Sequence, residues 1–187
     1  MNRKILITYF ENFASRAINA SKEVVCALDD KITIDDDIFC IEKKELKVSW
    51  NDIEKQINEI DEGFDFLILC GEAQSYEKVT IEVKAKNICK GVDKYGISKD
   101  INIEVLKDKY EEINTLFEIN NFLIKDINFS NNAGSYLCNR AYYLAMKHFK
   151  NKKIMFVHFP LLREQGGGCE KQELVKNMIN ILERVGK

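Results

Sequence analysis

The sequence predicts a three-layer α/β/α sandwich built around a mixed, mostly parallel sheet. Two patterns indicate this architecture: strand-like apolar runs alternate with amphipathic helical segments, and one run, residues 66–70, is apolar at every position. Alternation is typical of an α/β fold, and a continuous apolar run is typical of a central parallel strand covered on both faces. With 187 residues, 45% of them hydrophobic, we expect one domain over residues 1–187.

The elements before that central run begin with a βα unit. In order, they are a buried strand at 4–10, a helix with apolar positions 18, 24, 25 and 28, a strand at 31–42, and a helix after Ser49. Hydrophobic periodicity carries each of these assignments. Ser49 is expected to cap its helix, which places the isoleucines at 53, 57 and 60 on one face and ends at Gly63.

The elements after the central run end in a helix that closes the fold. They are a strand at 79–86, a turn-rich stretch at 90–102, a helix at 110–123, a short strand at 127–129, a helix at 136–149, a strand at 154–159 and a helix through Leu174, Met178, Ile181 and Leu182. Residues 79–86 alternate between apolar and polar, a period of two that is typical of a strand. This period places Glu82 on the polar face of that strand.

Composition excludes several classes of function. Lys and Arg number 28 and Asp and Glu 30, a net charge of -2, so no strong field favours nucleic acid. Apolar runs stop far short of the roughly 18 residues that a membrane span needs, and the amino end shows no secretory pattern. The six cysteines are scattered and only two histidines exist, which disfavours a metal site. We expect a cytoplasmic protein with free thiols.

Three residues form a candidate catalytic group. Cys138 lies near the start of a predicted helix, after a turn that contains glycine, where the helix dipole favours a thiolate. His158 lies at the end of an apolar strand, and Glu82 lies on another strand. Ligand sites of α/β sheets lie at the carboxyl ends of the strands. A nucleophile, a base and an orienting carboxylate would form a cysteine-hydrolase triad.

From position alone, a purely structural role explains each of these residues better than catalysis does. Cysteine is among the most commonly buried residues, and a histidine in a core is often simply hydrogen-bonded. Glu82 lies two and four residues before Lys84 and Lys86, so an exposed ladder of ion pairs also explains it. Position therefore favours packing over catalysis.

Four segments together resemble the pyroglutamyl peptidases, or pyrrolidone-carboxylate peptidases, a family of cytosolic cysteine peptidases. Residues 130–139, S-N-N-A-G-S-Y-L-C-N, are similar to the family's S-N-S-A-G-x-(F/Y)-x-C-N box. Residues 157–165 resemble its H-V-P…E-Q segment, residues 71–87 its G-x-A…I-x-I-E…N segment, and residues 10–19 its F-E-P-F…N-P segment. The four matches follow the family's order along the chain.

The resemblance implies a catalytic role for each member of the group. Cys138 would be the nucleophile, His158 the general base and then acid, and Glu82 the carboxylate that orients the imidazole. The implied reaction removes an N-terminal pyroglutamyl residue from a peptide through an acyl-enzyme, without a metal or an organic cofactor. The resemblance also implies assembly of the chain into dimers or tetramers.

The resemblance further implies a pocket for a small uncharged lactam. The side chains expected to hold the ring are Phe10, Phe13, Tyr136 and Leu137. Backbone groups near Glu72 would meet the polar atoms of the lactam, and Asn19 would brace the loop. Packing beneath a loop explains Phe10 and Phe13 equally well.

The chain departs from the family pattern near the implied site. The family has an arginine, expected to help hold the oxyanion, where this chain has Val92, and Lys90 or Lys94 are candidates to replace it. The G-x-A-x-G-R turn ends here in Tyr76, the loop at 10–15 lacks the family's glycines, and a proline-containing segment is absent between 96 and 113. Two alternatives therefore stay open: a cysteine hydrolase of another small amide, and a binding module without catalysis.

Overall fold

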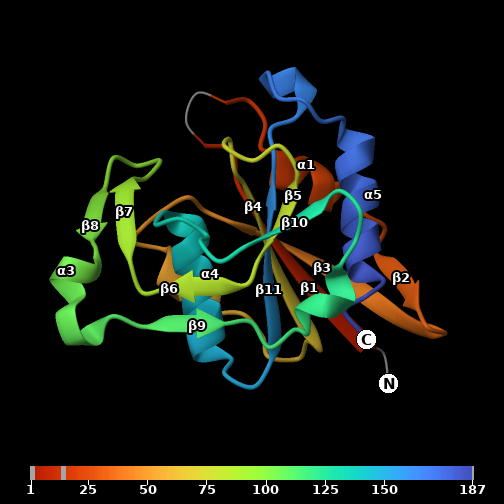
Figure 1. The fold of residues 1–187 in the computed structure, drawn as a ribbon, viewed down its shortest axis with the longest axis horizontal. Coiled ribbons are helices and arrows are strands. Elements are labelled where there is room, and N and C mark those ends of the chain that lie inside the picture. The colour runs from red at the N-terminus through yellow and green to blue at the C-terminus, as the bar shows by residue number, and fades with distance from the viewer. Residues whose placement is uncertain (1–2, 14–15, 187) are drawn as a thin grey trace.

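A seven-stranded sheet forms the centre of the computed structural model, which describes residues 3–13 and 16–186. Its order is β10 (Ile127–Ser130), β5 (Val79–Glu82), β11 (Lys153–Phe159), β4 (Phe66–Glu72), β1 (Arg3–Phe10), β3 (Asp37–Leu46) and β2 (Lys31–Ile34). Neighbouring strands are parallel except at β11–β5 and β2–β3 (Figure 1). The predicted mixed, mostly parallel sheet is confirmed.

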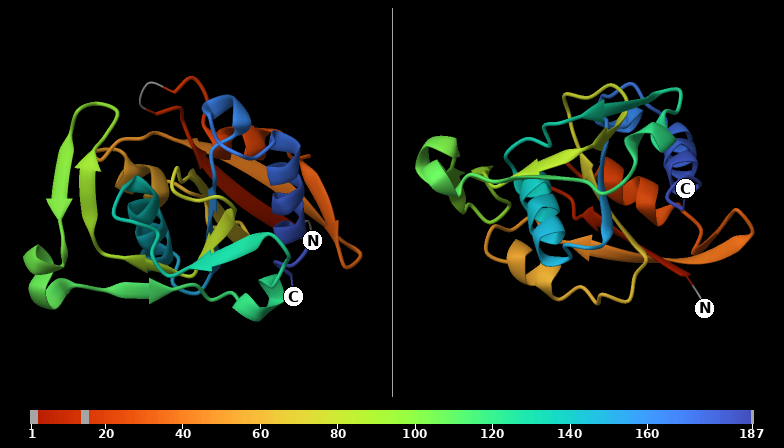
Figure 2. Two further views of the ribbon diagram at one scale, coloured as in Figure 1. Left: turned by 45° about the horizontal axis from the view of Figure 1, so that its top comes forward. Right: turned by 60° about the horizontal axis from the view of Figure 1, so that its bottom comes forward.

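Helices cover both faces of the sheet and complete the three layers (Figure 2). On one face, α1 (Ala20–Cys26) and α5 (Lys171–Leu182) pack against the sheet, and on the other, α2 (Ile53–Asn58) and α4 (Leu137–His148) do. Successive residues of a strand point to opposite faces. Ile68 of β4 accordingly joins the α1–α5 core and Leu67 the α2–α4 core, which is why this strand is apolar throughout.

A smaller subdomain of short elements extends beyond α4, at the left of Figure 1. It comprises β6 (Lys84–Lys86) paired with β9 (Glu112–Asn114), the hairpin of β7 (Cys89–Val92) and β8 (Ser98–Ile101), α3 (Ile103–Leu106) and the 3-10 helix η1 (Lys107–Lys109). Several side chains fasten the hairpin to the body. Among them, Trp50 Nε1 donates to the carbonyl of Gly91 at 3.0 Å, and the Tyr136 hydroxyl donates to that of Val92 at 2.9 Å.

Two predicted strands are each divided in the structure. Residues 31–42 form the hairpin of β2 and β3, because Asp35 and Asp36 adopt φ values of 48° and 71°, the conformation of a tight two-residue turn. Residues 79–86 separate into β5 and β6 at Val83. Its N–H donates to the Ser130 carbonyl at 2.7 Å and its carbonyl accepts from Thr115 at 3.0 Å, so the chain leaves the central sheet there.

Two further segments, residues 110–123 and 90–102, differ in local structure from what the sequence predicts. The helix predicted at 110–123 is wrong: β9 pairs with β6, and a 3-10 helix, η2 (Ile119–Phe122), follows. Tertiary pairing outweighs the weak helical preference of a stretch that holds three asparagines and a threonine. Residues 90–102 form an ordered hairpin, with Gly96 at φ 81° in its turn.

The remaining helices lie close to their predicted positions. Helix α4 is confirmed within one residue at each end, and α5 follows the 3-10 helix η3 (Arg163–Gln165). Helix α2 begins three residues later than Ser49 predicts, although Ser49 Oγ accepts the Asp52 N–H at 3.3 Å. Among the described residues, the helices are too short or too polar to cross a membrane. Ala14 and Ser15 of the altered glycine loop lie outside these residues.

Candidate active site

A buried hydrogen bond joins β5 to β11, its neighbour in the sheet. Nδ1 of His158 lies 2.8 Å from Oε1 of Glu82, which is fully buried, and His158 is only 5% exposed. The exposed-ladder interpretation of Glu82 is therefore wrong. An ionised carboxylate only accepts hydrogen bonds, so Nδ1 carries the proton and donates it to Glu82. Nε2 is then the nitrogen with a free lone pair, the form that a general base requires.

Cys138 lies over the same part of the sheet because Gly71 leaves room for its sulfur. A Cβ atom built on Gly71 would lie 2.8 Å from Cys138 Sγ and 2.9 Å from the ring of Phe156. Gly71 is also the register partner of His158 between β4 and β11. Neighbouring strands are about 4.8 Å apart, so the thiol lies beside the strand that carries the imidazole. The sulfur of Cys138 thus lies next to the strand whose His158 is hydrogen-bonded to Glu82.

Two side chains of α4 hold its first turn, and with it Cys138, against the strands. Asn139 is fully buried; its Oδ1 accepts the Lys86 N–H at 2.9 Å and its Nδ2 donates to the carbonyls of Lys86 and Ile88. The Tyr142 hydroxyl donates to the carbonyl of Glu82 at 3.0 Å. These bonds satisfy backbone groups at the end of β5 and at and just after the end of β6, so they tie the start of α4, and with it the thiol, to both strands.

Burial determines the protonation of the thiol. It raises the pKa of Cys138 to about 12, and the negative charge of Glu82 adds to the shift, whereas the residue's own N–H opposes it. The expected thiolate at the helix N-terminus is therefore outweighed in the unliganded site. At neutral pH the group is a thiol, and it requires a base to become a nucleophile.

One cavity of about 190 Å³ opens beside Cys138. All six residues predicted to bind substrate line it: Phe10, Phe13, Asn19, Glu72, Tyr136 and Leu137. The rings of Phe13 and Tyr136 pack at 5.5 Å, and Trp50 supports Tyr136 from behind at 5.4 Å. Phe10 is buried in the core and contributes to the lining as well, so packing and cavity formation coincide in this residue.

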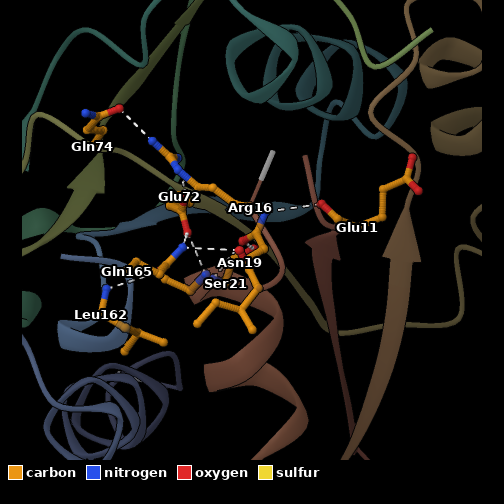
Figure 3. A network of polar contacts seen from close by, with 10 residues as sticks. Glu11, Arg16, Asn19, Ser21, Glu72, Gln74, Leu162 and Gln165 are labelled. Carbon is orange, nitrogen blue, oxygen red and sulfur yellow. Dashed lines mark hydrogen bonds and ion pairs between the residues drawn. The ribbon is translucent and has the colours of Figure 1, made fainter. Parts of the chain in front are cut away.

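A polar network surrounds one end of the cavity and is centred on Glu72 (Figure 3). Oε1 of Glu72 accepts from Arg16 Nη1 at 2.6 Å, while Oε2 accepts from the Ala20 N–H and from Gln165 Nε2, each at 2.7 Å. Three segments that are distant in the sequence thus converge on one carboxylate. The loop after β1, the end of β4 and η3 are held together by this group.

Asn19 braces the loop after β1, as predicted. Its Oδ1 accepts the Ser21 N–H at 3.0 Å and the Ser21 hydroxyl at 2.8 Å, so it caps α1. Its Nδ2 donates to the carbonyl of Glu11 at 3.2 Å (Figure 3). Both ends of the loop that carries Phe13 are therefore attached to one side chain.

The sequence model of one family, described as pyroglutamyl peptidase, matches residues 3–111, more than half of the chain. The chain belongs to the pyroglutamyl peptidase family. The pyrrolidone-carboxylate peptidase of Fusobacterium nucleatum is 30% identical over 179 residues, covering 87% of this chain and 80% of that protein. That of Thermosipho africanus is 34% identical over 183 residues, covering 87% and 83%.

Solved structures of pyrrolidone carboxyl peptidases share the fold. The Thermus thermophilus enzyme aligns with a TM-score of 0.86 at 21% identity, over 97% of this chain and 100% of that one. A mutant of the Pyrococcus furiosus enzyme aligns with a TM-score of 0.81 at 24% identity, over 98% of both chains. At these identities the likeness shows the α/β fold of the family.

Four lining residues escaped the sequence analysis: the apolar Ile18 and Val48 and the polar Arg16 and Gln74. Arg16 Nη2 donates to Gln74 Oε1 at 2.6 Å, so both belong to the network around Glu72. The signal that could have found Arg16 is a single cation between Phe13 and Asn19, in a loop already assigned to the pocket. The lysines considered as replacements for the family's arginine are absent from the described lining, and Lys94 pairs with Glu11.

The described residues contain no group of three or more His, Cys, Asp or Glu side chains placed to hold a metal ion. The functional groups at the candidate site are those of its side chains and backbone. They comprise a half-buried thiol, an imidazole hydrogen-bonded to a carboxylate, and a mostly apolar cavity with one polar end.

Proposed function

We propose that this chain is a cysteine peptidase that removes an N-terminal pyroglutamyl residue from peptides. One observation carries the proposal: the cavity lined by Phe10, Phe13 and Tyr136 opens at Cys138, beside the hydrogen-bonded pair of His158 and Glu82. Membership of the pyroglutamyl peptidase family supports the same conclusion.

The proposed reaction begins when the Cys138 thiol transfers its proton to Nε2 of His158, while Glu82 stabilises the imidazolium. The sulfur attacks the carbonyl carbon that joins the pyroglutamyl residue to the next residue. An S–C bond forms, and the C–N bond breaks as His158 protonates the leaving amine. Water then attacks the thioester and passes a proton to His158. Pyroglutamate leaves as the S–C bond breaks, and the proton returns to sulfur.

The cavity suits a lactam ring in size and character. Apolar ring carbons gain from contact with Phe13 and Tyr136, since burial of apolar area and aromatic packing both favour binding. The polar end at Glu72 faces the lactam N–H and C=O, which need partners when they leave water. A ligand site of this kind, mostly apolar with a few polar groups, fixes the orientation of a small substrate.

The oxyanion is stabilised differently from the family pattern. Val92, which replaces the expected arginine, is 54% exposed on β7 and lies outside the described lining. We assign the role to backbone N–H groups in the first turn of α4, which carries Cys138. Loss of one oxyanion donor typically lowers turnover by about 10²- to 10³-fold. We therefore expect slower turnover than in enzymes that carry the arginine.

The test is release of an amine reporter from a pyroglutamyl conjugate by the purified protein. Cys138→Ser should abolish release, whereas Cys26→Ser, at an exposed free thiol, should retain it. A prolyl conjugate, which lacks the ring carbonyl, should be cleaved far more slowly. Equal cleavage of both conjugates, or release that survives Cys138→Ser, would refute the proposal.

A second candidate is a cysteine hydrolase that acts on another small amide. The ion pair of Arg16 and Glu72 at the polar end of the cavity favours it, because these charges add ionic recognition to an otherwise neutral pocket. In that case a thiol-directed probe labels Cys138 while pyroglutamyl conjugates stay intact. A binding module without catalysis would show neither reaction. A cytoplasmic location and assembly into dimers or tetramers stay predictions, the latter testable by light scattering.

A further inference from the structure

Tyr76 makes a contact with the candidate triad that the family resemblance does not explain. It lies in the loop after β4, at the position where the family's G-x-A-x-G-R turn ends in arginine. Its hydroxyl is 3.0 Å from Oε1 of Glu82 and 3.2 Å from Oγ of Ser130. Its ring packs edge-on against the imidazole of His158, with centroids 5.7 Å apart and an interplanar angle of 78°.

The hydrogen bonds at Tyr76 form a chain with one direction. Glu82 can only accept, so the Tyr76 hydroxyl donates to it, and the single phenol proton is then used. Ser130 Oγ must therefore donate to the Tyr76 oxygen, and it accepts the Asn132 N–H at 3.0 Å. Burial raises the pKa of Tyr76, so the phenol keeps this proton at neutral pH.

Both donors to Glu82 meet at the same oxygen. Oε1 accepts from Tyr76 and from His158 Nδ1, whereas the buried Oε2 accepts from none of the described residues. Two hydrogen bonds from different directions fix the rotation of a carboxylate, and one leaves it free to turn. Without the Tyr76 hydroxyl, His158 itself would be the remaining anchor of the carboxylate that is meant to orient it.

We propose that Tyr76, held in turn by Ser130, is a positioning residue that fixes the Glu82 carboxylate for His158. The inference rests on the proposed function, since it assigns a role within that triad. It also connects the segment that leads to Cys138, in which Ser130 lies, to the orienting carboxylate. The positions of Cys138 and His158 relative to each other are thereby fixed by side-chain hydrogen bonds as well as by the sheet.

The test compares Tyr76→Phe, which keeps the ring and removes the hydroxyl, with the wild-type protein. Ser130→Ala removes the next link and should have a smaller effect in the same direction. Tyr110→Phe is the matched control, because it removes a phenol-to-carboxylate hydrogen bond, to Glu112, outside the described cavity lining. We expect Tyr76→Phe to lower kcat by roughly tenfold, the equivalent of one charged hydrogen bond, with little change in KM.

A pH profile separates positioning from general damage. The charged or titratable groups around the imidazole are Glu82 on β5, Tyr76 itself and Cys138 on α4, with Glu72 on β4 acting on the thiol. Loss of the phenol donor concentrates negative charge on Glu82, which holds a proton on the imidazole more tightly. The acid limb of kcat/KM should therefore move to higher pH in Tyr76→Phe.

An NMR measurement tests the positioning role of Tyr76 without an activity assay. With only His148 and His158 in the chain, ¹⁵N-labelled histidine spectra are simple, and His148→Gln assigns them. In Tyr76→Phe the His158 Nδ1–H signal should move downfield, because Oε1 then accepts one bond instead of two. An unchanged signal and acid limb in a folded variant would overturn the proposal, even where kcat falls. A wild-type protein that cleaves no pyroglutamyl conjugate would refute the proposed function alone.

Discussion

The guanidinium of Arg16 and the carboxylate of Glu72 form an ion pair at the polar end of the cavity, with Nη1 and Oε1 2.6 Å apart. The Glu72 side chain is only 8% exposed, and its other oxygen accepts from a backbone N–H and from Gln165. The N–H belongs to Ala20, at a position where the family pattern has proline, which carries no such proton. The substitution and the buried carboxylate therefore suit each other.

Removal of Glu72 should be costly for stability. Glu72→Ala leaves Arg16 and two neutral donors without their acceptor, and we expect a loss of about 2–4 kcal/mol in the free energy of unfolding. Urea denaturation measures it. Glu59→Ala, which breaks an exposed pair with Lys55, is the control and should cost less than about 1 kcal/mol. Equal effects would show that the network does not hold the loop.

Gly71→Ala should lower activity strongly while the fold persists. The added Cβ would lie 2.8 Å from Cys138 Sγ and 2.9 Å from Phe156, so the sulfur must move away from its place beside His158. A displacement of this size at a reacting atom typically costs about 10²-fold in rate, with a stability loss of roughly 1–3 kcal/mol from overpacking. Gly168→Ala, where an added Cβ meets nothing within 4 Å, should be neutral in both assays.

Alkylation of Cys138 should depend steeply on pH. Burial raises its pKa to about 12, so the thiolate fraction is small at neutral pH and increases as the pH rises toward that value. Iodoacetamide labelling of Cys138 should thus accelerate with alkaline pH and, near pH 7, be slower than that of the exposed Cys26. Mass spectrometry of the labelled peptides measures both rates. A fast rate that is independent of pH would instead indicate a preformed thiolate.

Glu82→Gln should separate the two effects of this carboxylate. Glutamine keeps the shape but cannot stabilise the imidazolium or impose the Nδ1–H tautomer, and such a change costs about 10⁴-fold in kcat in a well-studied triad. The same substitution removes a negative charge that raises the pKa of Cys138, so alkylation of the thiol should begin at lower pH. Reduced turnover together with easier alkylation is the expected combination. Unchanged alkylation would contradict this electrostatic coupling.

Much of the fold followed from local patterns. The apolar runs of β1, β4 and β11 and the periodicity of α4 were correctly assigned, because each buries a face whose spacing is written in the chain. The helix predicted at 110–123 is wrong, because the pairing of Ile113 with Ala85 on β6 determines the conformation of this segment. Contacts between distant residues are not visible in a local window.

The candidate site, like the fold, could be predicted only in part from the sequence. Cys138, His158 and Glu82 were proposed from their residue types and from motifs, and the positions of the six pocket residues agree with the cavity. Position alone favoured an exposed Glu82, because a polar residue at period two resembles one that faces water. The structure places α4 over that face, and Glu82 is buried.

By itself, the sequence determined the class of fold and the residues with the chemistry for a thiol peptidase, since hydrophobic spacing and side-chain type are local properties. Only the tertiary structure decided that Gly71 leaves room for the sulfur of Cys138 and that Arg16 and Tyr76 contact Glu72 and Glu82. Such contacts depend on strand register and loop path. These are set by packing of the whole sheet between its helices, and no single segment contains that information.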